Sequence, residues 1–291
     1  MSMNTISKDS HYKLTSGTQI PLIGFGVYLV PPLLTANLVY QALKAGYRLI
    51  DTAQIYRNES EVGEGVLRWI SENPESNKRE DIFIITKIWD SFHGYESAKQ
   101  SIKASIKKIC VPGIDYIDLF LIHSPNSNKQ KRLETYQALQ ESKDSNYVHS
   151  IGVSNYGINH LEELYNWKDL KYPPVSNQIE IHPWLMRSQL VDYCSRRQII
   201  CQAYSPLAKG RKFNDLTLNS IAKKYEKNNA QILIRWSVQK GFVVLPKTLQ
   251  IDRLKSNFNI WDFELSNEDI LSLEHEESYF ITGWDPTLYN G

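Results

Sequence analysis

The chain contains little cysteine, and its few cysteines form no recognisable pattern. Only Cys110, Cys194 and Cys201 occur among the 291 residues, and none belongs to a C-x-x-C pair. Disulfide-stabilised scaffolds and structural zinc sites use more cysteines at closer spacing. The sequence therefore argues against both, predicts no metal and favours a reducing compartment.

The sequence also lacks a long apolar run and an excess of charge of either sign. No segment approaches the roughly 18 to 20 apolar residues that span a bilayer, and residues 1–10 lack the apolar core of a signal peptide. The 33 basic residues nearly balance the 32 acidic ones, which leaves a net charge of +1. We therefore expect a cytoplasmic protein with no nucleic-acid or membrane partner.

No segment rich in proline, glycine or serine divides the chain into parts. A length of 291 residues with 42% hydrophobic content lies near the upper limit of roughly 250 to 300 residues for one hydrophobic core. The sequence therefore predicts a single domain over residues 1–291.

What the sequence does contain is a regular alternation of short aliphatic runs and longer amphipathic segments. Runs such as 82–85 are continuously apolar, which is typical of strands buried on both faces of a parallel sheet. Eight strand and helix units predict an α/β fold of the (β/α)8 TIM-barrel class. The expected strands are residues 23–28, 48–52, 82–89, 116–123, 150–154, 176–181, 200–205 and 243–247.

A helical pattern follows each expected strand. The expected helices are residues 35–45, 60–71, 95–109, 133–142, 159–167, 188–197, 218–239 with a break near Asn228, and 251–258. Asn58 followed by Glu61 has the spacing of a capping box at the start of the second helix. Two parts lie outside the repeat: an N-terminal β-hairpin over 12–22, expected to close the barrel bottom, and a short C-terminal tail from 266.

Four polar residues follow apolar strands at the positions where barrel enzymes form their active sites. They are Asp51, Tyr56, Lys87 and His123. A neighbouring ammonium lowers the pKa of a phenol, so Lys87 is expected to make Tyr56 a better proton donor, with Asp51 holding Lys87 and His123 orienting a substrate oxygen. Each residue alone has a structural explanation, such as helix capping. Their occurrence at successive strand ends favours a proton-transfer site.

The segments around these residues resemble the catalytic blocks of aldo-keto reductases. The similarity follows the family's order and covers nearly all residues from about 12 to 286. The matching segments are 49–53, Tyr56, 86–87, 121–125, 151–156, 177–183, 203–207 and 245–248. The resemblance implies a fungal or microbial type of NADPH-dependent oxidoreductase that reduces aldehydes and some ketones, with Tyr56 as general acid assisted by Lys87, Asp51 and His123.

The sequence does not have the glycine-rich loop of a Rossmann fold. Gly24-Phe25-Gly26 is followed by Leu29 where the third glycine of G-x-G-x-x-G belongs. The two glycines are expected to allow a close approach of the first strand to a ligand or a neighbour, with a plain turn as the alternative.

The resemblance instead assigns the nicotinamide end of a cofactor site to later strand ends. Ser154, Asn155 and Gln178 match the positions that hydrogen-bond the carboxamide, and Tyr204 matches the ring that stacks on the nicotinamide. Ser205 and Leu207 in the same block are assigned to the cofactor as well.

Cations late in the chain are candidates for binding phosphate. Lys247 ends the last strand, and Arg253 lies in the first turn of the next helix, where the helix terminus adds partial positive charge. The resemblance implies the same, because Lys247, Thr248, Arg253 and Asn257 match the family's contacts to the 2′-phosphate and adenine of NADPH. Ser256 departs from the family, in which an acidic residue often touches adenine.

Aromatic residues are expected to line an apolar mouth for the substrate. Tyr28 and Trp89 lie at strand ends, and Trp284 lies on the tail. Tyr28 and Ser124 occupy positions that are often tryptophan in relatives, and the connection after His123 is short. We therefore expect an open pocket that accepts small-molecule carbonyl compounds, chiefly aldehydes, in a monomer, with a weak dimer as the alternative.

Two other functions compete with this interpretation. A metal-dependent hydrolase could use Asp51, His123 and His182 as ligands, but the motifs typical of such enzymes are missing. A barrel that binds NADPH as a redox sensor or regulatory subunit, with little turnover, is the alternative from another class.

Overall fold

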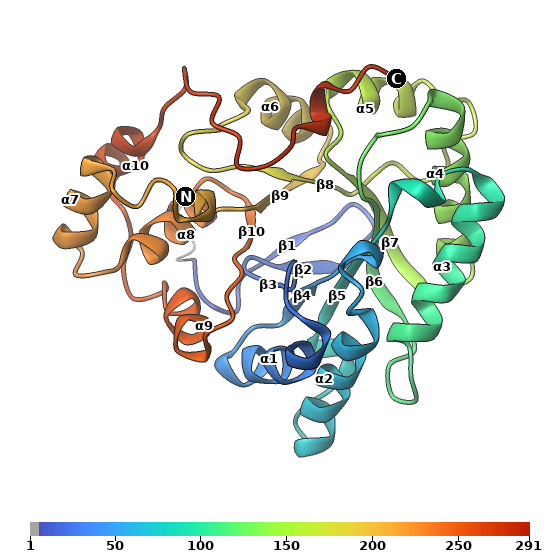
Figure 1. Ribbon diagram of the computed structural model, residues 1–291, viewed down its shortest axis with the longest axis horizontal. Coiled ribbons are helices and arrows are strands. Elements are labelled where there is room, and N and C mark those ends of the chain that lie inside the picture. The colour runs from blue at the N-terminus through green and yellow to red at the C-terminus, as the bar shows by residue number, and fades with distance from the viewer. Residues whose placement is uncertain (1–5) are drawn as a thin grey trace.

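The structure is a computed structural model that describes residues 6–291. At its centre, parallel strands stand side by side in sequence order and form a barrel (Figure 1). The barrel closes where Ile23 pairs with Val244 and the Gly26 amide donates to the Pro246 carbonyl, 3.0 Å away. The predicted (β/α)8 barrel is therefore confirmed. Its strands are β3 (Phe25–Gly26), β4 (Leu49–Asp51), β5 (Phe83–Ile88), β6 (Ile117–Ile122), β7 (Val148–Ser154), β8 (Ser176–Glu180), β9 (Ile200–Tyr204) and β10 (Val243–Leu245).

Helices form a ring outside these strands (Figure 1). Over residues 6–291 they are α1 (Pro32–Ala45), α2 (Glu59–Glu72), α3 (Tyr95–Ile109), α4 (Lys129–Asp144), α5 (Ile158–Tyr165), α6 (Ser188–Arg196), α7 (Leu216–Lys224), α8 (Asn229–Gln239), α9 (Ile251–Phe258) and α10 (Asn267–Leu273). Alternate side chains of each strand face the ring of helices or the barrel interior. The apolar core accordingly has two parts, one between strands and helices and a smaller one inside the barrel.

An antiparallel hairpin closes the end of the barrel at which the strands begin. It consists of β1 (His11–Lys13) and β2 (Gln19–Pro21). The Ser16 and Thr18 hydroxyls lie 2.8 and 2.9 Å from the Ser150 hydroxyl near the start of β7. Leu14 and Ile20 pack with the inner core. The expected hairpin and its place at the barrel bottom are confirmed.

Gly24, just before β3, allows two strands to approach closely. A Cβ atom at this position would lie 1.8 Å from a methyl carbon of Leu49 on β4. Close approach to a neighbour, rather than a plain turn, therefore explains this glycine.

The capping box expected at Asn58 and Glu61 is wrong, although α2 does begin right after Asn58. The Asn58 side chain makes no capping bond. Its amide nitrogen donates to the Val27 carbonyl at 3.0 Å, and its oxygen accepts from the Thr52 hydroxyl at 2.7 Å. Asn58 is fully buried, so it joins α2 to the ends of β3 and β4 instead.

The long helical segment predicted over 218–239 is two helices, α7 and α8, which meet at the expected break. Asn228 caps α8 by accepting from the Gln231 amide at 2.9 Å.

The tail also carries a helix, α10, which its sequence pattern did not reveal. No helix within residues 6–291 is long and apolar enough to cross a membrane.

Candidate active site

The strands end at a pocket of about 750 Å³, the first pocket, at the opposite end of the barrel from the hairpin. Its wall is formed by the ends of strands, by the loops that follow them and by the C-terminal tail. The predicted site residues that line it are Tyr28, Asp51, Tyr56, Trp89, His123, Ser154, Asn155, Gln178, Tyr204, Ser205, Leu207, Lys247, Arg253 and Trp284.

Lys87 lies fully buried on β5, and three acceptors surround its ammonium group. Nζ donates to Asp51 Oδ1 at 2.7 Å and Oδ2 at 2.9 Å, and to the Thr52 carbonyl at 2.8 Å. Burial lowers the pKa of Lys87, and the Asp51 carboxylate acts in the opposite direction. A buried ammonium is stable only when paired in this way. The expected ion pair between Asp51 and Lys87 is therefore present.

Tyr56 sits in a short 3₁₀ turn after β4, and its hydroxyl lies 3.5 Å from Lys87 Nζ. Burial raises the pKa of the phenol well above its ordinary value, and the negative charge of Asp51 adds to this. The expectation that Lys87 gives Tyr56 a lowered pKa is wrong. The ammonium is paired with Asp51, so its effect on the phenol is smaller than the cost of ionising that group out of water. The hydroxyl therefore stays protonated at neutral pH.

His123 follows β6 and lies edge-on to two aromatic rings. Its ring centre is 5.7 Å from that of Tyr56 and 5.1 Å from that of Trp89. Burial, together with the charge of Lys87, lowers the pKa of His123 well below its ordinary value. Within residues 6–291, its buried Nδ1 atom has no hydrogen-bond partner. A neutral imidazole thus faces the protonated phenol of Tyr56.

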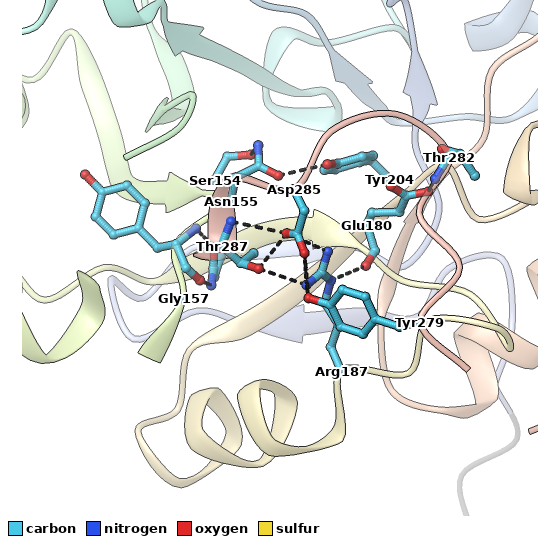
Figure 2. A network of polar contacts seen from close by, with 12 residues as sticks. Ser154, Asn155, Gly157, Glu180, Arg187, Tyr204, Tyr279, Thr282, Asp285 and Thr287 are labelled. Atoms are coloured by element: carbon cyan, nitrogen blue, oxygen red, sulfur yellow. Dashed lines mark hydrogen bonds and ion pairs between the residues drawn. The ribbon is translucent and has the colours of Figure 1, made fainter. Parts of the chain in front are cut away.

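A network of amides and hydroxyls lies beside this group. Gln178 Nε2 donates to Asp51 Oδ1 at 2.9 Å, which connects the network to the Lys87 ion pair. The Ser154 hydroxyl donates to the Gln178 carbonyl at 2.7 Å. Asn155, with a left-handed φ of 60°, accepts from the Tyr204 hydroxyl at 2.8 Å (Figure 2). The fold therefore brings these four predicted residues together.

A second pocket of about 630 Å³ continues the first one. Both pockets are lined by Leu207, Phe213, Lys247 and Arg253, so these residues mark the junction. The predicted residues Thr248 and Asn257 line the second pocket only, as does Ser256.

Lys247 and Arg253 are cations that have no anionic partner in the described part of the chain. Neither side chain makes an ion pair or a hydrogen bond with any residue from 6 to 291. Burial lowers the pKa of Lys247. Arg253 is exposed in the first turn of α9, where a cation opposes the helix dipole unless an anion is bound. The junction is therefore suited to an anionic group such as phosphate.

Three aromatic residues form the outer wall of the first pocket. The ring of Tyr28 lies 5.1 Å from that of Tyr56, and the ring of Trp284 lies 6.1 Å from that of Trp89. Tyr28 is 49% exposed and Trp284 is 39% exposed, so both border the opening. Their apolar faces suit the non-polar part of an organic ligand.

The tail that carries Trp284 is fixed to the barrel through Arg187, at the start of α6 (Figure 2). The guanidinium donates to Asp285 Oδ1 at 2.9 Å and to the Thr287 hydroxyl at 2.9 Å, while its Nε atom donates to the Glu180 carbonyl at 3.0 Å. The Glu180 side chain accepts from the Thr282 amide at 3.0 Å. These bonds hold the tail on both sides of Trp284.

Several lining residues were not predicted from the sequence. They are Leu29, Ile55, Glu180, Lys209, Phe213 and Gly283, among others. Glu180 carries a usable signal, because it is a charged residue at the end of a strand, where barrel enzymes form their active sites. Lys209 lies in a short 3₁₀ turn and Gly283 in a bend of the tail, and the spacing of residues in the sequence predicts neither.

The rival metal-binding set is not assembled. Among residues 6–291, no three His, Cys, Asp or Glu side chains are grouped to hold a metal ion. Asp51 is bonded to Lys87, and His182 lies 3.3 Å from a Glu180 carboxylate oxygen.

Comparisons with known proteins agree with the predicted resemblance, which is thereby confirmed. The model of the aldo/keto reductase family matches residues 30–276. A Saccharomyces cerevisiae protein named as an uncharacterized oxidoreductase is 47% identical over 276 residues, covering 95% of this chain and 97% of that protein. The glyoxal reductase of Bacillus subtilis is 39% identical over 269 residues, covering 92% of each. A crystal structure of an aldo/keto reductase from Brucella melitensis matches with a TM-score of 0.83 at 40% identity, covering 91% of this chain and 98% of that one.

An oxidoreductase barrel with these similarities along nearly its whole length belongs to the aldo/keto reductase family.

Proposed function

We propose that the protein reduces aldehydes and some ketones to alcohols with NADPH, with Tyr56 as the general acid. The observation that carries the proposal is the line of contacts from Asp51 through Lys87 to the Tyr56 hydroxyl, which faces the first pocket. A protonated phenol beside a fixed ammonium can give up its proton to a carbonyl oxygen.

The positions of the polar groups suggest how the proton moves. The high pKa of Tyr56 keeps its proton in place until a substrate oxygen gains negative charge. After transfer, the phenolate is stabilised by Lys87, whose own position is fixed by Asp51 and the Thr52 carbonyl. Neutral His123 donates a hydrogen bond to the same oxygen, and solvent restores the Tyr56 proton.

The two joined pockets fit an elongated dinucleotide, and their residues suit its two ends. When bound, the nicotinamide supplies the hydride that reduces the carbonyl carbon. Ser154, Asn155 and Gln178 would hold its carboxamide, and the ring of Tyr204 would stack on the nicotinamide. In support of this, Gln178 Oε1 accepts no hydrogen bond from residues 6–291, although both Nε2 hydrogens have acceptors. Ser205 and Leu207 line the first pocket between the proposed nicotinamide site and the junction with the second pocket.

Binding of the 2′-phosphate, which NADH lacks, by the cations at the pocket junction would favour NADPH over NADH. At the junction of the pockets, Lys247 and Arg253 make no ion pair with any residue from 6 to 291, and Thr248 and Asn257 add polar groups in the second pocket. Charge-assisted bonds from a guanidinium to phosphate are among the stronger polar contacts in proteins.

The substrate is a carbonyl compound with an apolar part that lies against Tyr28, Trp89 and Trp284. The openness of the aromatic wall, together with the similarity to a relative named glyoxal reductase, supports small aldehydes. Activated ketones would be slower substrates.

Replacing Tyr56 by Phe tests the proposed general acid. The variant keeps the ring and its packing but lacks the proton, so kcat for aldehyde reduction should fall by about 10² to 10⁴. Loss of nicotinamide absorbance with simple aldehydes gives the rate, and fluorescence titration with NADPH gives binding. Unchanged NADPH binding is the control.

Two results would contradict the proposal. Tyr56→Phe could reduce aldehydes as fast as the parent protein, or the parent protein could bind NADPH and consume none with any carbonyl compound. The second result would point to a sensor or regulatory subunit.

A further inference from the structure

Glu59 is a buried carboxylate outside the group of residues considered so far. It is the first residue of α2 and is 1% exposed. The Thr86 hydroxyl donates to Oε1 at 2.7 Å, and Lys108 Nζ lies 3.2 Å from Oε2. Because the Lys108 side chain is 47% exposed, one partner of this ion pair remains in contact with water.

Glu59 and Lys87 lie on opposite faces of strand β5. Side chains alternate along β5, with Phe83 and Ile85 in the inner core and Ile84 and Ile88 in the outer one. Lys87 therefore points into the barrel towards Asp51, and Thr86 points outward to Glu59.

The residue before Glu59 also supports the Lys87 site. Asn58 accepts a hydrogen bond from the Thr52 hydroxyl at 2.7 Å, and the Thr52 carbonyl accepts from Lys87 Nζ at 2.8 Å. The start of α2 thus contacts both strands that hold the ammonium. A displacement of this helix end would therefore also displace Lys87, through the contact of Asn58 with Thr52 and that of Glu59 with Thr86.

A full negative charge at Glu59 exceeds what its hydrogen bond needs. A glutamine oxygen would accept from Thr86 equally well, and burying a carboxylate carries a desolvation cost. The helix start favours a negative side chain, which offsets part of that cost. Beyond this hydrogen bond, the charge adds the ion pair with Lys108 and an electric field in the buried region around Lys87.

We propose that Glu59 is a positioning residue of the proposed active site, a second buried carboxylate that works with Asp51 to keep Lys87 positively charged. The inference rests on the proposed function, in which charged Lys87 stabilises the phenolate of Tyr56. Glu59 acts from the outer face of β5, so it leaves the pocket side of Lys87 open to Tyr56.

The titratable groups around Lys87 come from four parts of the fold. Asp51 is on β4, Tyr56 follows β4, His123 follows β6 and Glu59 is on α2. Burial lowers the pKa of Lys87, while Asp51 and then Glu59 raise it.

The groups around Glu59 are fewer. Lys108 faces it from α3. Lys44 is the charged residue of α1, and it pairs with Glu72 at the far end of α2. On α2 itself, Glu61 and Glu64 follow, of which Glu64 is exposed.

A direct titration of Lys87 tests the proposal without turnover. Lysine labelled with ¹³C at Cε is followed by NMR against pH, with the Lys87 signal assigned from a Lys87→Met sample. In Glu59→Gln, which keeps the hydrogen bond from Thr86, the midpoint for Lys87 should move to lower pH by roughly half a pH unit or more, about a threefold loss of proton affinity. Thermal unfolding checks that this variant folds.

Two further variants show whether the charge at position 59 is responsible. Glu64→Gln removes the same charge from an exposed place on the same helix and should leave the midpoint unchanged. Lys108→Gln removes the positive partner of Glu59 and should move the midpoint to higher pH. An unchanged midpoint in Glu59→Gln, or equal shifts in Glu59→Gln and Glu64→Gln, would overturn the proposal.

The pH profile of kcat/KM separates this inference from the proposed function. Because charged Lys87 is required, activity should fall as Lys87 loses its proton, and Glu59→Gln should move that basic limb to lower pH by the same amount as the NMR midpoint. A shifted midpoint with no carbonyl reduction at any pH would contradict the proposed function alone. A basic limb that stays in place while the midpoint moves would contradict the role of Glu59 in the reaction.

Discussion

Asp51 is the residue through which the two halves of the proposed site are connected. One carboxylate oxygen, Oδ1, accepts from both Lys87 Nζ at 2.7 Å and Gln178 Nε2 at 2.9 Å. Lys87 contacts Tyr56, the proposed proton donor, and Gln178 belongs to the group proposed to hold the nicotinamide. A change at Asp51 is therefore expected to affect both proton donation and the placement of the hydride donor.

Arg253 is the residue that tests the preference for NADPH. Arg253→Ala removes an exposed guanidinium that makes no ion pair within residues 6–291, so the fold should be unaffected. The Kd for NADPH should rise by about tenfold or more, which corresponds to roughly 1.5 to 3 kcal/mol for a charge-assisted bond. The Kd for NADH should change by less than about twofold. Fluorescence titration with both cofactors measures the two constants.

Lys255→Ala provides the matched control on the same helix, since Lys255 is exposed and lies outside both pockets. Equal weakening of NADPH and NADH by Arg253→Ala would remove the argument for a 2′-phosphate.

At the residue scale, the barrel rule predicted most of the site residues at strand ends, but it gave no signal for Glu59 on α2. Asp51, Lys87 and His123 follow apolar runs in the sequence, so the barrel rule places them at one rim. Glu59 has no such marker, because the first turn of a helix is an ordinary place for an acidic residue. The pKa of Tyr56 was predicted in the wrong direction, because burial cannot be read from spacing.

The C-terminal tail forms part of the wall of the first pocket. It runs from α10 across the barrel to α5 (Figure 1). Besides the bonds to Arg187, its path depends on Gly157 before α5, where a Cβ atom would lie 2.1 Å from the Thr287 carbonyl oxygen. The tail is thus held by specific contacts at several points, although it is mostly irregular in structure.

Removing Arg187 tests whether these contacts hold Trp284 in place. Both side chains of the Arg187 and Asp285 pair are less than 10% exposed, so Arg187→Met leaves a buried carboxylate without its partner and should release the tail locally. The value of kcat/KM for a bulky aromatic aldehyde should fall by about fivefold or more. For a two-carbon or three-carbon aldehyde it should change by less than about twofold. A panel of aldehydes assayed under the same conditions measures the difference.

Arg196→Met, at an exposed position on α6, is the control for loss of an arginine from this region. An equal loss for large and small aldehydes in Arg187→Met would show that the tail does not select substrates by size.

The sequence period identified the strands and most helices, since buried parallel strands are continuously apolar. Element ends were harder to predict. The side chain of Asn58 contacts β3 and β4 rather than its own helix, and no local pattern contains that information. The α10 helix was missed because it lies outside the barrel repeat and spans only residues Asn267–Leu273.

On the scale of the whole molecule, buried histidines make stability depend on pH. Burial lowers the pKa of His93 to about 4, and its Nδ1 atom lies 2.7 Å from the Ser127 hydroxyl. The unfolded chain binds a proton at this residue below about pH 6.5, while the folded chain does not until about pH 4. The contribution of His93 is therefore present above pH 6.5 and is lost as the pH falls towards 4.

Replacing His93 by Gln should reduce this dependence. Between pH 8 and pH 5, the free energy of unfolding should fall by about 2 kcal/mol more in the parent protein than in His93→Gln. Urea unfolding at several pH values provides the measurement. Parallel curves for the two proteins would contradict the expectation.

Asp90, whose Oδ1 atom lies 3.8 Å from His93 Nε2, acts in the opposite direction. Burial raises its pKa to about 6, so its contribution is present below about pH 4 and is lost as the pH rises through 6. An Asp90→Asn variant therefore serves as the control of opposite sign.

The single domain, the cytoplasmic location and the monomeric state stay predictions.

The hairpin β1–β2 seals the base of the barrel with Leu14 and Ile20. Ligands therefore reach the first pocket from the opposite end of the barrel. In the proposed reaction, the nucleotide, the aldehyde and the alcohol all enter and leave through the rim at that end, which Trp284 and the tail partly line. For that reaction we expect product release through the shared opening, rather than the chemical step, to limit the turnover rate.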